Sequence, residues 1–358
     1  MKIGIVGLGL IGSSIAKCLA STDHIVYGYD TSETVYEHAK EIKLVDDIKC
    51  LEEMANVCDL VVLCVPSRQV IDMVDEALSG TATVTDVASV KKNIFEYVST
   101  LDKDKQSRFF GGHPMAGSEQ SGIKAGRADL FRGRLWVTVP PVDSDLTSFS
   151  LIKDFISELG AEQTVLSAAE HDNLVAYASH LPQLAASSLM DLARGKSENN
   201  VALLRLAAGG FRDMTRVASS NPKIWNDIVK ENSDAITNSL TEYIDVLTKV
   251  RDDVKSQNSQ AIADLFDRAR KARVELPESA KLEGEYDEIV VNVKNEPGTI
   301  EKIITLAKNI NIYDIRIEHS PNGAEGLMTL LVDSDTGQKF EDILNKAKFD
   351  VSRSKLTI

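Results

Sequence analysis

The sequence predicts three domains in series: an α/β domain with a parallel sheet, an all-helical domain and a small α+β domain. Three observations predict this fold class. Short apolar strands alternate with helical segments over residues 1–166, helical periodicity alone continues over residues 167–275, and a mixed strand and helix pattern occupies residues 286–358. The chain of 358 residues is long enough for two or three separate cores.

The first domain opens with a strand, and further apolar segments repeat along it. The expected strands are residues 2–6, 24–30, 59–65, 82–87 and 135–139, and segments of helical period, such as 11–20 and 67–78, lie between them. Near-continuous apolar strands separated by helices are typical of a parallel sheet that helices cover on both faces.

A glycine motif joins the first strand to the first helix; its residues are Gly7, Leu8, Gly9, Leu10, Ile11 and Gly12. Gly7 permits a tight turn, Gly9 lets a pyrophosphate approach the backbone, and Gly12 lets helix and strand pack closely. The helix N-terminus adds unpaired N–H groups for the phosphates. This pattern predicts a Rossmann-type dinucleotide-binding domain.

Asp30 ends the second strand, where a carboxylate is placed to accept hydrogen bonds from ribose hydroxyls. The same carboxylate would repel a 2′-phosphate, so NAD is expected rather than NADP. Val65 and Pro66, at the end of the third long strand, are expected at the same cofactor site.

Two polar residues follow later strands of this domain. Ser89 comes just after the strand at 82–87, and His113 follows the apolar segment RFFGG within the glycine-rich stretch GGHPMAGSEQSGIKAG. Ligands of open α/β sheets bind outside the carboxyl ends of the strands. A neutral imidazole suits proton transfer, so His113 is a candidate catalytic residue, with a core or surface histidine as the alternative.

The helical domain contains two further candidates. His180 lies just before Pro182, which should kink or interrupt the helix and can turn side chains into a cleft, with a buried core histidine as the alternative. Arg212 and Arg216 share one helical face, with Asp213 beside them. Arginine in an apolar helix indicates either an internal salt-bridge network or an anionic ligand, and the pattern alone leaves both open.

A polar, proline-bearing linker at 276–285 precedes the last domain. Expected strands at 286–293, 311–319, 326–333 and 349–356 enclose helices at 297–309 and 336–347. The order β-α-β-β-α-β is the ferredoxin-like pattern.

Composition limits the partners. Formal net charge is −14, which argues against nucleic acid and anionic membranes as partners. No apolar run is long enough to span a bilayer. The four cysteines lack metal-ligand spacing, so no metal site is expected, and reduced thiols in a cytoplasmic protein are the simplest interpretation.

The glycine motif, VTDVASVK, GGHPMAGSEQSGIKAG, ASHLPQ and GGFRDMTRVASSNPKIW together resemble the prephenate dehydrogenases of tyrosine biosynthesis. The last 70 or so residues resemble an ACT domain, a small module that binds amino acids. The resemblance covers essentially the whole chain. It implies a homodimer held by the helical domain, with the active site between that domain and the NAD-binding domain.

The resemblance also implies a reaction and roles for individual residues. The reaction is oxidative decarboxylation of prephenate to 4-hydroxyphenylpyruvate, CO2 and NADH. His113 would accept the proton of the ring hydroxyl, and Ser89 would help to hold that hydroxyl. The remaining residues would bind or surround substrate: Arg216 on a carboxylate, Asp213 orienting it, Ser179, His180 and Gln183 lining the pocket, and Glu119 at its edge.

In the ACT-like domain, the resemblance implies an amino-acid effector, with tyrosine as the obvious end product. Asn295, Pro297 and Gly298 join the first strand to the first helix, where backbone N–H groups could meet a carboxylate. A module used only for dimerisation or stability is the alternative. Some relatives have histidine where this chain has Gln183, so inhibition by tyrosine at the active site could differ.

Three other functions remain open at this point. An arogenate dehydrogenase would recognise an amine where prephenate has a keto group. A β-hydroxyacid dehydrogenase would need a catalytic lysine on the helical domain, and residues 168–180 contain none. A non-enzymatic sensor of NAD and amino acids would tolerate loss of His113.

Overall fold

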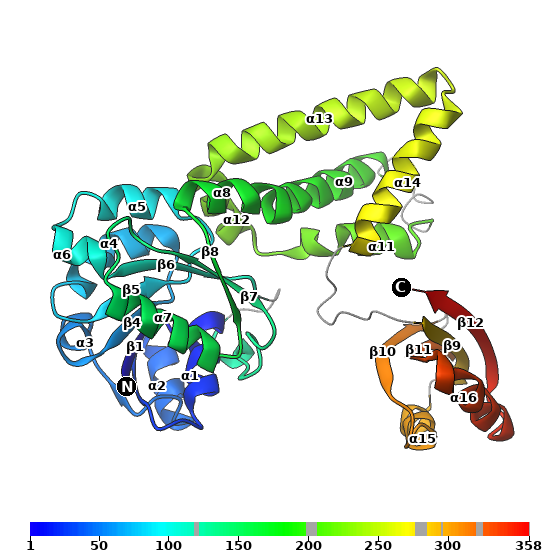
Figure 1. The fold of residues 1–358 in the computed structure, drawn as a ribbon, viewed down its shortest axis with the longest axis horizontal. Coiled ribbons are helices and arrows are strands. Elements are labelled where there is room, and N and C mark those ends of the chain that lie inside the picture. The colour runs from blue at the N-terminus through cyan, green and yellow to red at the C-terminus, as the bar shows by residue number, and fades with distance from the viewer. Residues whose placement is uncertain (118–121, 198–205, 276–284, 295, 320–324, 358) are drawn as a thin grey trace. The chain divides into compact units, whose positions relative to one another are not determined.

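The structure is a computed structural model of residues 1–358, and it describes all of them except 118–121, 198–205, 276–284, 295, 320–324 and 358. The chain divides into two compact units, Met1–Ser256 and Gln257–Ile358 (Figure 1). Each unit is described by itself.

The first unit begins with an eight-stranded sheet in the order β3-β2-β1-β4-β5-β6-β7-β8. Its strands are β1 (Lys2–Val6), β2 (Ile25–Tyr29), β3 (Asp47–Ile48), β4 (Leu60–Leu63), β5 (Thr83–Asp86), β6 (Phe109–Pro114), β7 (Leu135–Val139) and β8 (Glu162–Val165). The chain moves outward from β1 in both directions, so the carboxyl ends of β1 and β4 form the switch point at which open α/β sheets bind ligands.

The sheet is not wholly parallel, contrary to the prediction. β7 pairs antiparallel with β6, although it pairs parallel with β8. Between β6 and β7 the described chain forms only a short 3₁₀ turn, η1 (Ile123–Ala125). A parallel return needs a crossover long enough to recross the sheet, usually a helix, and without one the chain re-enters at the edge where β6 ends.

Helices cover both faces of this sheet, as the strand pattern predicted. Ile3 and Ile5 pack on the face that carries α1 (Leu10–Leu19), α2 (Glu33–Glu41) and α7 (Leu146–Glu158). Val61 and Val84 pack on the opposite face, beneath α3 (Leu51–Val57), α4 (Ser67–Ala77) and α5 (Lys92–Val98). A short helix, α6 (Lys103–Ser107), precedes β6. The two apolar clusters hold the strand ends in fixed positions.

The rest of the first unit is helical. It comprises α8 (Ala168–Val175), a π-helical turn η2 (Ala176–His180), α9 (Leu181–Ser197), α11 (Gly209–Thr215), a 3₁₀ turn η3 (Arg216–Ser219), α12 (Pro222–Glu231) and α13 (Ser233–Lys255). α8, η2 and α9 follow one another as a nearly continuous rod (Figure 1). Several large apolar side chains on α9 and α13 are exposed: Leu192, Ile244, Leu247 and Val254.

The wide turn η2 lies where the sequence predicted a disturbance of the helix. Pro182 is the second residue of α9, and its ring has no N–H to donate to the preceding turn. A π-helical turn inserts extra backbone into a helix, and such turns often occur at functional sites. Ser179 and His180 lie in this turn.

The second unit contains α14 (Ser259–Glu275) and a four-stranded antiparallel sheet in the order β10-β11-β9-β12. Its elements after α14 are β9 (Glu285–Lys294), α15 (Thr299–Leu306), β10 (Ile312–His319), β11 (Glu325–Asp333), α16 (Ser334–Lys346) and β12 (Asp350–Thr357). Ile289, Val291 and Met328 pack with Ile303 of α15 and Phe340 of α16 in one core. The element order is the predicted β-α-β-β-α-β.

Candidate active site

The glycine turn between β1 and α1 has the shape that a dinucleotide requires. Gly7 has φ +90°, a conformation that L side chains rarely adopt. A side chain on Gly12 would overlap the carbonyl oxygen of Gly7, whereas the space beside Gly9 is open. Helix and strand are therefore close, and a pyrophosphate has room to meet the N-terminus of α1.

Asp30 lies directly against this turn. One carboxylate oxygen accepts a hydrogen bond from the backbone N–H of Leu8 at 2.8 Å, and the other accepts from the N–H of Ser32 at 2.9 Å. These bonds fix the carboxylate after β2. Val65 and Pro66 connect β4 to α4 on the neighbouring strand, at the same edge of the sheet.

Beside this edge lies a cavity of about 370 Å³ within the first unit. The α/β part contributes Ser89, His113 and residues 114–117, while η2 contributes Ser179 and His180. The helical part also contributes Ser220, Asn221 and Trp225. Four of the residues predicted from sequence therefore come together, although they are far apart along the chain.

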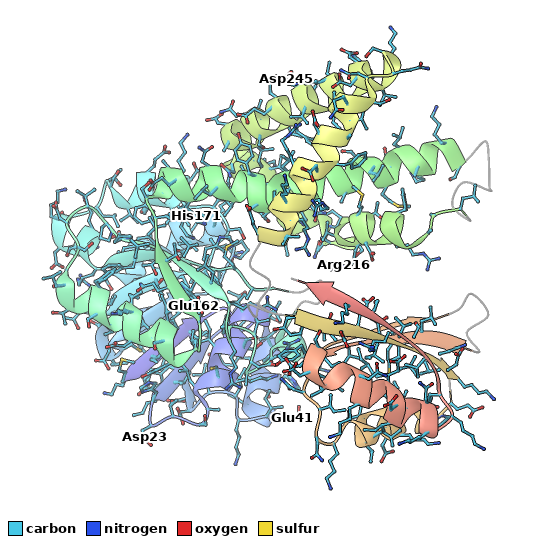
Figure 2. The ribbon with its side chains drawn as sticks, turned by 45° about the vertical axis from the view of Figure 1, so that its right-hand side comes forward. Asp23, Glu41, Glu162, His171, Arg216 and Asp245 are labelled. Atoms are coloured by element: carbon cyan, nitrogen blue, oxygen red, sulfur yellow. The ribbon has the colours of Figure 1, made fainter. Side chains whose placement is uncertain are left out.

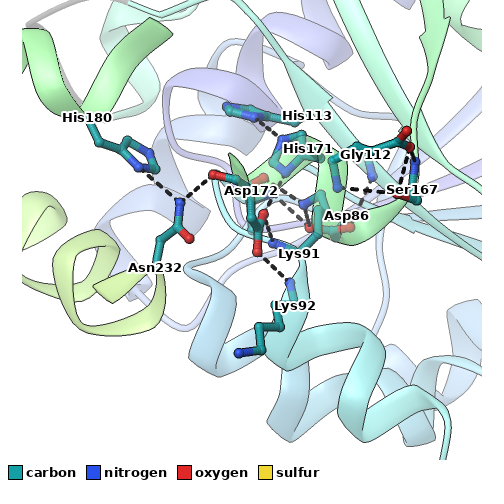
Figure 3. Close-up of polar contacts among 12 residues, drawn as sticks. Asp86, Lys91, Lys92, Gly112, His113, Ser167, His171, Asp172, His180 and Asn232 are labelled. Atoms are coloured by element: carbon teal, nitrogen blue, oxygen red, sulfur yellow. Dashed lines mark hydrogen bonds and ion pairs between the residues drawn. The ribbon is translucent and has the colours of Figure 1, made fainter. Parts of the chain in front are cut away.

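A chain of hydrogen bonds extends from His113 into the helical part (Figure 3). Nδ1 of His113 lies 2.8 Å from Nε2 of His171, and Nδ1 of His171 lies 2.7 Å from Oδ1 of Asp172. His171 is fully buried in α8 and was not among the predicted site residues.

This chain determines which nitrogen of His113 is free. Asp172 also accepts backbone N–H groups from Lys91 and Lys92 at 2.8 Å each, so it acts as an acceptor and His171 must carry its proton on Nδ1. Nε2 of His171 is then an acceptor, and His113 donates to it from Nδ1. The lone pair of His113 consequently lies on Nε2.

The environment keeps His113 neutral. Burial is the main cause that lowers the pKa of its imidazole well below the usual value, and the nearby His171, Lys91 and His180 lower this pKa further. A neutral imidazole with a free Nε2 lone pair is a general base.

Beneath His113, a fully buried ion pair joins the two segments that hold His113 and Ser89. Nζ of Lys91 lies 2.6 Å from Oδ2 of Asp86 and also donates to the carbonyl of Ala88 at 2.6 Å. Asp86 accepts the N–H of Gly112 at 3.1 Å and that of Ala88 at 2.9 Å. The residue before His113 and the residue before Ser89 are thus bonded to one carboxylate.

His180 faces the cavity as a hydrogen-bond donor. The side-chain amide of Asn232 donates to the carbonyl of Asp172 at 2.7 Å, and its nitrogen lies 3.2 Å from Nδ1 of His180. Nδ1 therefore accepts, which leaves the proton of the neutral ring on Nε2. Burial, partly offset by Asp172, lowers the pKa of His180 to about 4. The ring also packs edge to face against Trp225, with the two ring centroids 6.0 Å apart.

Other predicted residues lie outside this cavity. The amide of the buried Gln183 donates to the carbonyl of Val217 at 2.9 Å, so it holds η3 in place. Arg216 and Asp213 are exposed, and Figure 2 shows Arg216 well separated from His171. Among the described residues, no lysine or arginine lines the cavity. Glu119 lies outside the described residues.

The prediction from sequence missed His171, Asp172, Asn232 and Trp225. One signal was present, because His171 and Asp172 adjoin in the first turns of a helix that begins with a capping box at Ser167. Neighbouring acid and imidazole groups are costly to bury unless they form hydrogen bonds.

The remaining predictions concern the second unit and metals. Gly298 has φ +87° and caps the N-terminus of α15, next to Pro297, while Asn295 lies outside the described residues. Within the described part of the chain, no group of three His, Cys, Asp or Glu residues could hold a metal ion. In the same part, every helix is too short or too polar to cross a membrane.

The fold and the site together define a class of protein: an oxidoreductase whose nucleotide-binding α/β domain meets a helical domain at an imidazole base. Residues 15–165 match the model for the prephenate dehydrogenase nucleotide-binding domain, and residues 167–268 match that for the prephenate dehydrogenase dimerization domain. The chain belongs to the prephenate dehydrogenase family.

Individual proteins agree with this assignment. The chain is 32% identical over 349 residues to the prephenate dehydrogenase of Bacillus subtilis (strain 168), covering 93% of this chain and 92% of the relative. Two similar solved structures each cover 77% of this chain. Synechocystis arogenate dehydrogenase is 30% identical, with TM-score 0.69 and all of that chain covered. Prephenate dehydrogenase from A. aeolicus, in complex with hydroxyphenyl propionate and NAD+, is 28% identical, with TM-score 0.71 and 98% of that chain covered.

Proposed function

We propose that the protein catalyses the NAD-dependent oxidative decarboxylation of prephenate to 4-hydroxyphenylpyruvate and CO2. The observation that carries this proposal is the free Nε2 lone pair of His113, which faces a cavity beside the glycine turn. The similarity to the Bacillus subtilis enzyme over nearly the whole chain supports the choice of substrate.

His113 has a simple task in this reaction. Nε2 takes the proton of the ring hydroxyl while a hydride leaves the ring carbon that bears this hydroxyl. NAD supplies the hydride acceptor. The carboxylate then leaves as CO2, its bonding electrons make the ring aromatic, and the imidazolium returns the proton to the phenolate oxygen. No net proton is released, so one imidazole that cycles between two states is sufficient.

The other polar groups of the cavity have supporting roles in this proposal. Ser89 lies beside His113 on the cavity wall and hydrogen-bonds the ring hydroxyl. The Nε2–H of His180 and the hydroxyl of Ser179 donate to substrate oxygens. The buried chain through His171 to Asp172 fixes the tautomer of His113 and so keeps its lone pair on Nε2.

Arg216 is proposed to bind a substrate carboxylate, with Asp213 orienting it and Glu119 at the pocket edge. This role depends on the family resemblance, since Arg216 is exposed and outside the cavity walls. It lies a few residues before Ser220 and Asn221, which do line the cavity. Gln183, bonded to that turn, is proposed to set its position.

Asp30, Val65, Pro66 and the glycine turn are proposed to bind NAD. The carboxylate of Asp30 lies where it could accept hydrogen bonds from the ribose hydroxyls. A 2′-phosphate at the same place would be repelled by its negative charge.

We also propose domains at 1–166, 167–275 and 286–358, with a linker at 276–285, and a homodimer formed through the helical domain. The matching family model is that of a dimerization domain, and exposed apolar side chains on α9 and α13 support this. The last domain is proposed to be an ACT domain that binds tyrosine near Pro297 and Gly298. The β-α-β-β-α-β order and the left-handed Gly298 at the start of α15 support it.

The proposal is tested by NADH formation with prephenate and with arogenate, each with and without added tyrosine. Faster turnover of arogenate than of prephenate would identify arogenate as the substrate. The similarity to Synechocystis arogenate dehydrogenase makes this the second candidate function. His113→Asn should lower kcat by about 10²- to 10⁴-fold while the Kd for NAD stays within about twofold. NAD binding without turnover of either compound would indicate a sensor instead of an enzyme.

A further inference from the structure

A second cavity, of about 630 Å³, adjoins the His113 cavity, and the two share Met115, Ala116 and Gly117 in their walls. Leu10, the first residue of α1, contributes to it, and so do Arg127, Arg132 and Arg134. One carboxylate, that of Asp129, is also part of the lining. The cavity therefore adjoins both the glycine turn and the His113 cavity, and its charged lining is predominantly cationic.

Arg132 and Arg134 project from a turn whose backbone is firmly held. Gly133 between them has φ +64°, its N–H donates to the carbonyl of Gly160 at 2.8 Å, and the N–H of Arg134 donates to the carbonyl of Phe131 at 2.9 Å. Phe131 is fully buried in the core of the sheet domain. The two arginines thus have a fixed base although their side chains are exposed.

Arg127 is attached to α1 itself. Its backbone N–H donates to the hydroxyl of Ser14 at 2.9 Å, and Nζ of Lys17 donates to the carbonyl of Gly126 at 2.7 Å. A side chain at position 126 would overlap the hydroxyl of Ser13, so the backbone lies against the helix. The three arginines are consequently held around one space by two anchored segments.

Within the described residues, the positive charge in this space is only partly neutralised. Nε of Arg127 lies 3.1 Å from Oδ1 of Asp129, but the guanidinium groups of Arg132 and Arg134 form no hydrogen bond or ion pair with any residue in the described ranges. The chain as a whole carries a net charge of −14. Two unpaired guanidinium groups in so acidic a protein form a local attractive site for anions, and their planar forks suit carboxylates.

The neighbouring His113 cavity lacks such cations, since its described walls contain no lysine or arginine. We propose that Arg127, Arg132 and Arg134 form a capture site for a dicarboxylate. The dicarboxylate binds there first and then moves past residues 115–117 into the His113 cavity. This proposal rests on the proposed function, because it takes the dicarboxylate to be prephenate. The capture site accelerates encounter and does not take part in the chemical step.

The test compares the wild type with R132Q/R134Q. A matched control is K103Q/K153Q, which removes two positive charges from exposed positions on α6 and α7. NADH formation gives kcat and kcat/KM for prephenate at about 0.02 M and about 0.5 M salt, where the Debye length falls from roughly 20 Å to about 4 Å. The KM for NAD is measured on the same three proteins.

At low salt, kcat/KM for prephenate should fall about 5- to 10-fold in R132Q/R134Q, with kcat and the KM for NAD within about twofold of wild type. At high salt the difference should shrink below about twofold, and the control should match wild type at both. An unchanged kcat/KM, or an equal loss in the control, would overturn the capture site. A raised KM for NAD alone would assign the arginines to the cofactor phosphates. A wild type inactive on prephenate would instead refute the proposed function, and the capture site with it.

Discussion

Asp172→Asn is expected to disable the base without touching the cavity. The wild-type carboxylate accepts three hydrogen bonds, from the imidazole of His171 and from the backbone N–H groups of Lys91 and Lys92. Asparagine presents one oxygen and one NH2 group, so at least one of these three donors must face another donor. The anion opposite the imidazolium is also lost.

The size of the effect follows from these contacts. A hydrogen bond to a charged group contributes about 1.5–3 kcal/mol, which corresponds to roughly 10- to 150-fold in kcat. If the amide turns its NH2 group toward His171, that ring must carry its proton on Nε2, and the lone pair of His113 moves to Nδ1. The base then has the wrong tautomer, which in a comparable catalytic triad costs about 10⁴-fold.

The assay is NADH formation under saturating prephenate and NAD, with urea unfolding of the same samples. Asp172→Asn should lose both activity and about 1–3 kcal/mol of unfolding free energy, because the start of α5 loses an acceptor. His171→Gln should lose activity comparably but keep that acceptor. Asp245→Asn, at an exposed position on α13, serves as control. Destabilised Asp172→Asn with kcat within about twofold of wild type would mean that Asp172 only caps α5, and would refute the proposed chain.

Further perturbations test other parts of the site. Lys91→Met should destabilise the fold by about 3–5 kcal/mol because Asp86 stays buried and unpaired, and adding Asp86→Asn should restore part of it, as urea unfolding would show. Because the pKa of His180 is lowered to about 4, its contribution to the unfolding free energy is complete above about pH 6.5. This contribution is lost as the pH falls toward 4, by roughly 2–3 kcal/mol. His180→Gln should therefore flatten the decline of the unfolding free energy over this pH range. Gly12→Val should abolish NAD binding measured by calorimetry, since its side chain would overlap the Gly7 carbonyl. Arg216→Ala should raise the KM for prephenate about 10-fold or more and leave the Kd for NAD unchanged; an unaltered KM would remove Arg216 from the substrate site.

Much of the fold was predictable because local pattern and global structure agree. The glycine motif required a strand before it and a helix after it, and β1 and α1 have nearly the predicted bounds. The β-α-β-β-α-β order of the second unit was also evident, since each of its strands packs one apolar face on a helix and so alternates in sequence.

The direction of β7 was not predictable from its residues. Leu135–Val139 is equally apolar whichever way it runs, and only the preceding connection decides. Short edge strands such as β3, with two residues, leave too little pattern to detect.

Some residues of the site were predictable from the sequence and others were not, for similar reasons. His113 and Ser89 were found because strand ends in an α/β sheet have a known place. His171 was missed because the contact with His113 joins residues 58 apart, on elements of different type, and no spacing rule links them. The position of Arg216 depends on how η3 sits against α9, a packing relation that helical periodicity does not encode.

The hydrogen-bond chain behind His113 makes the two halves of the first unit chemically inseparable. The nucleotide-binding half carries the imidazole, but α8 supplies the groups that decide which of its nitrogens bears the proton, and the same Asp172 caps α5 of the nucleotide-binding half. A fragment ending before α8 would keep the cofactor turn yet hold a histidine with no defined tautomer. Chimeras that exchange nucleotide-binding domains between relatives therefore stay active only if the α5 of the incoming domain fits the His-Asp pair of the helical part that receives it.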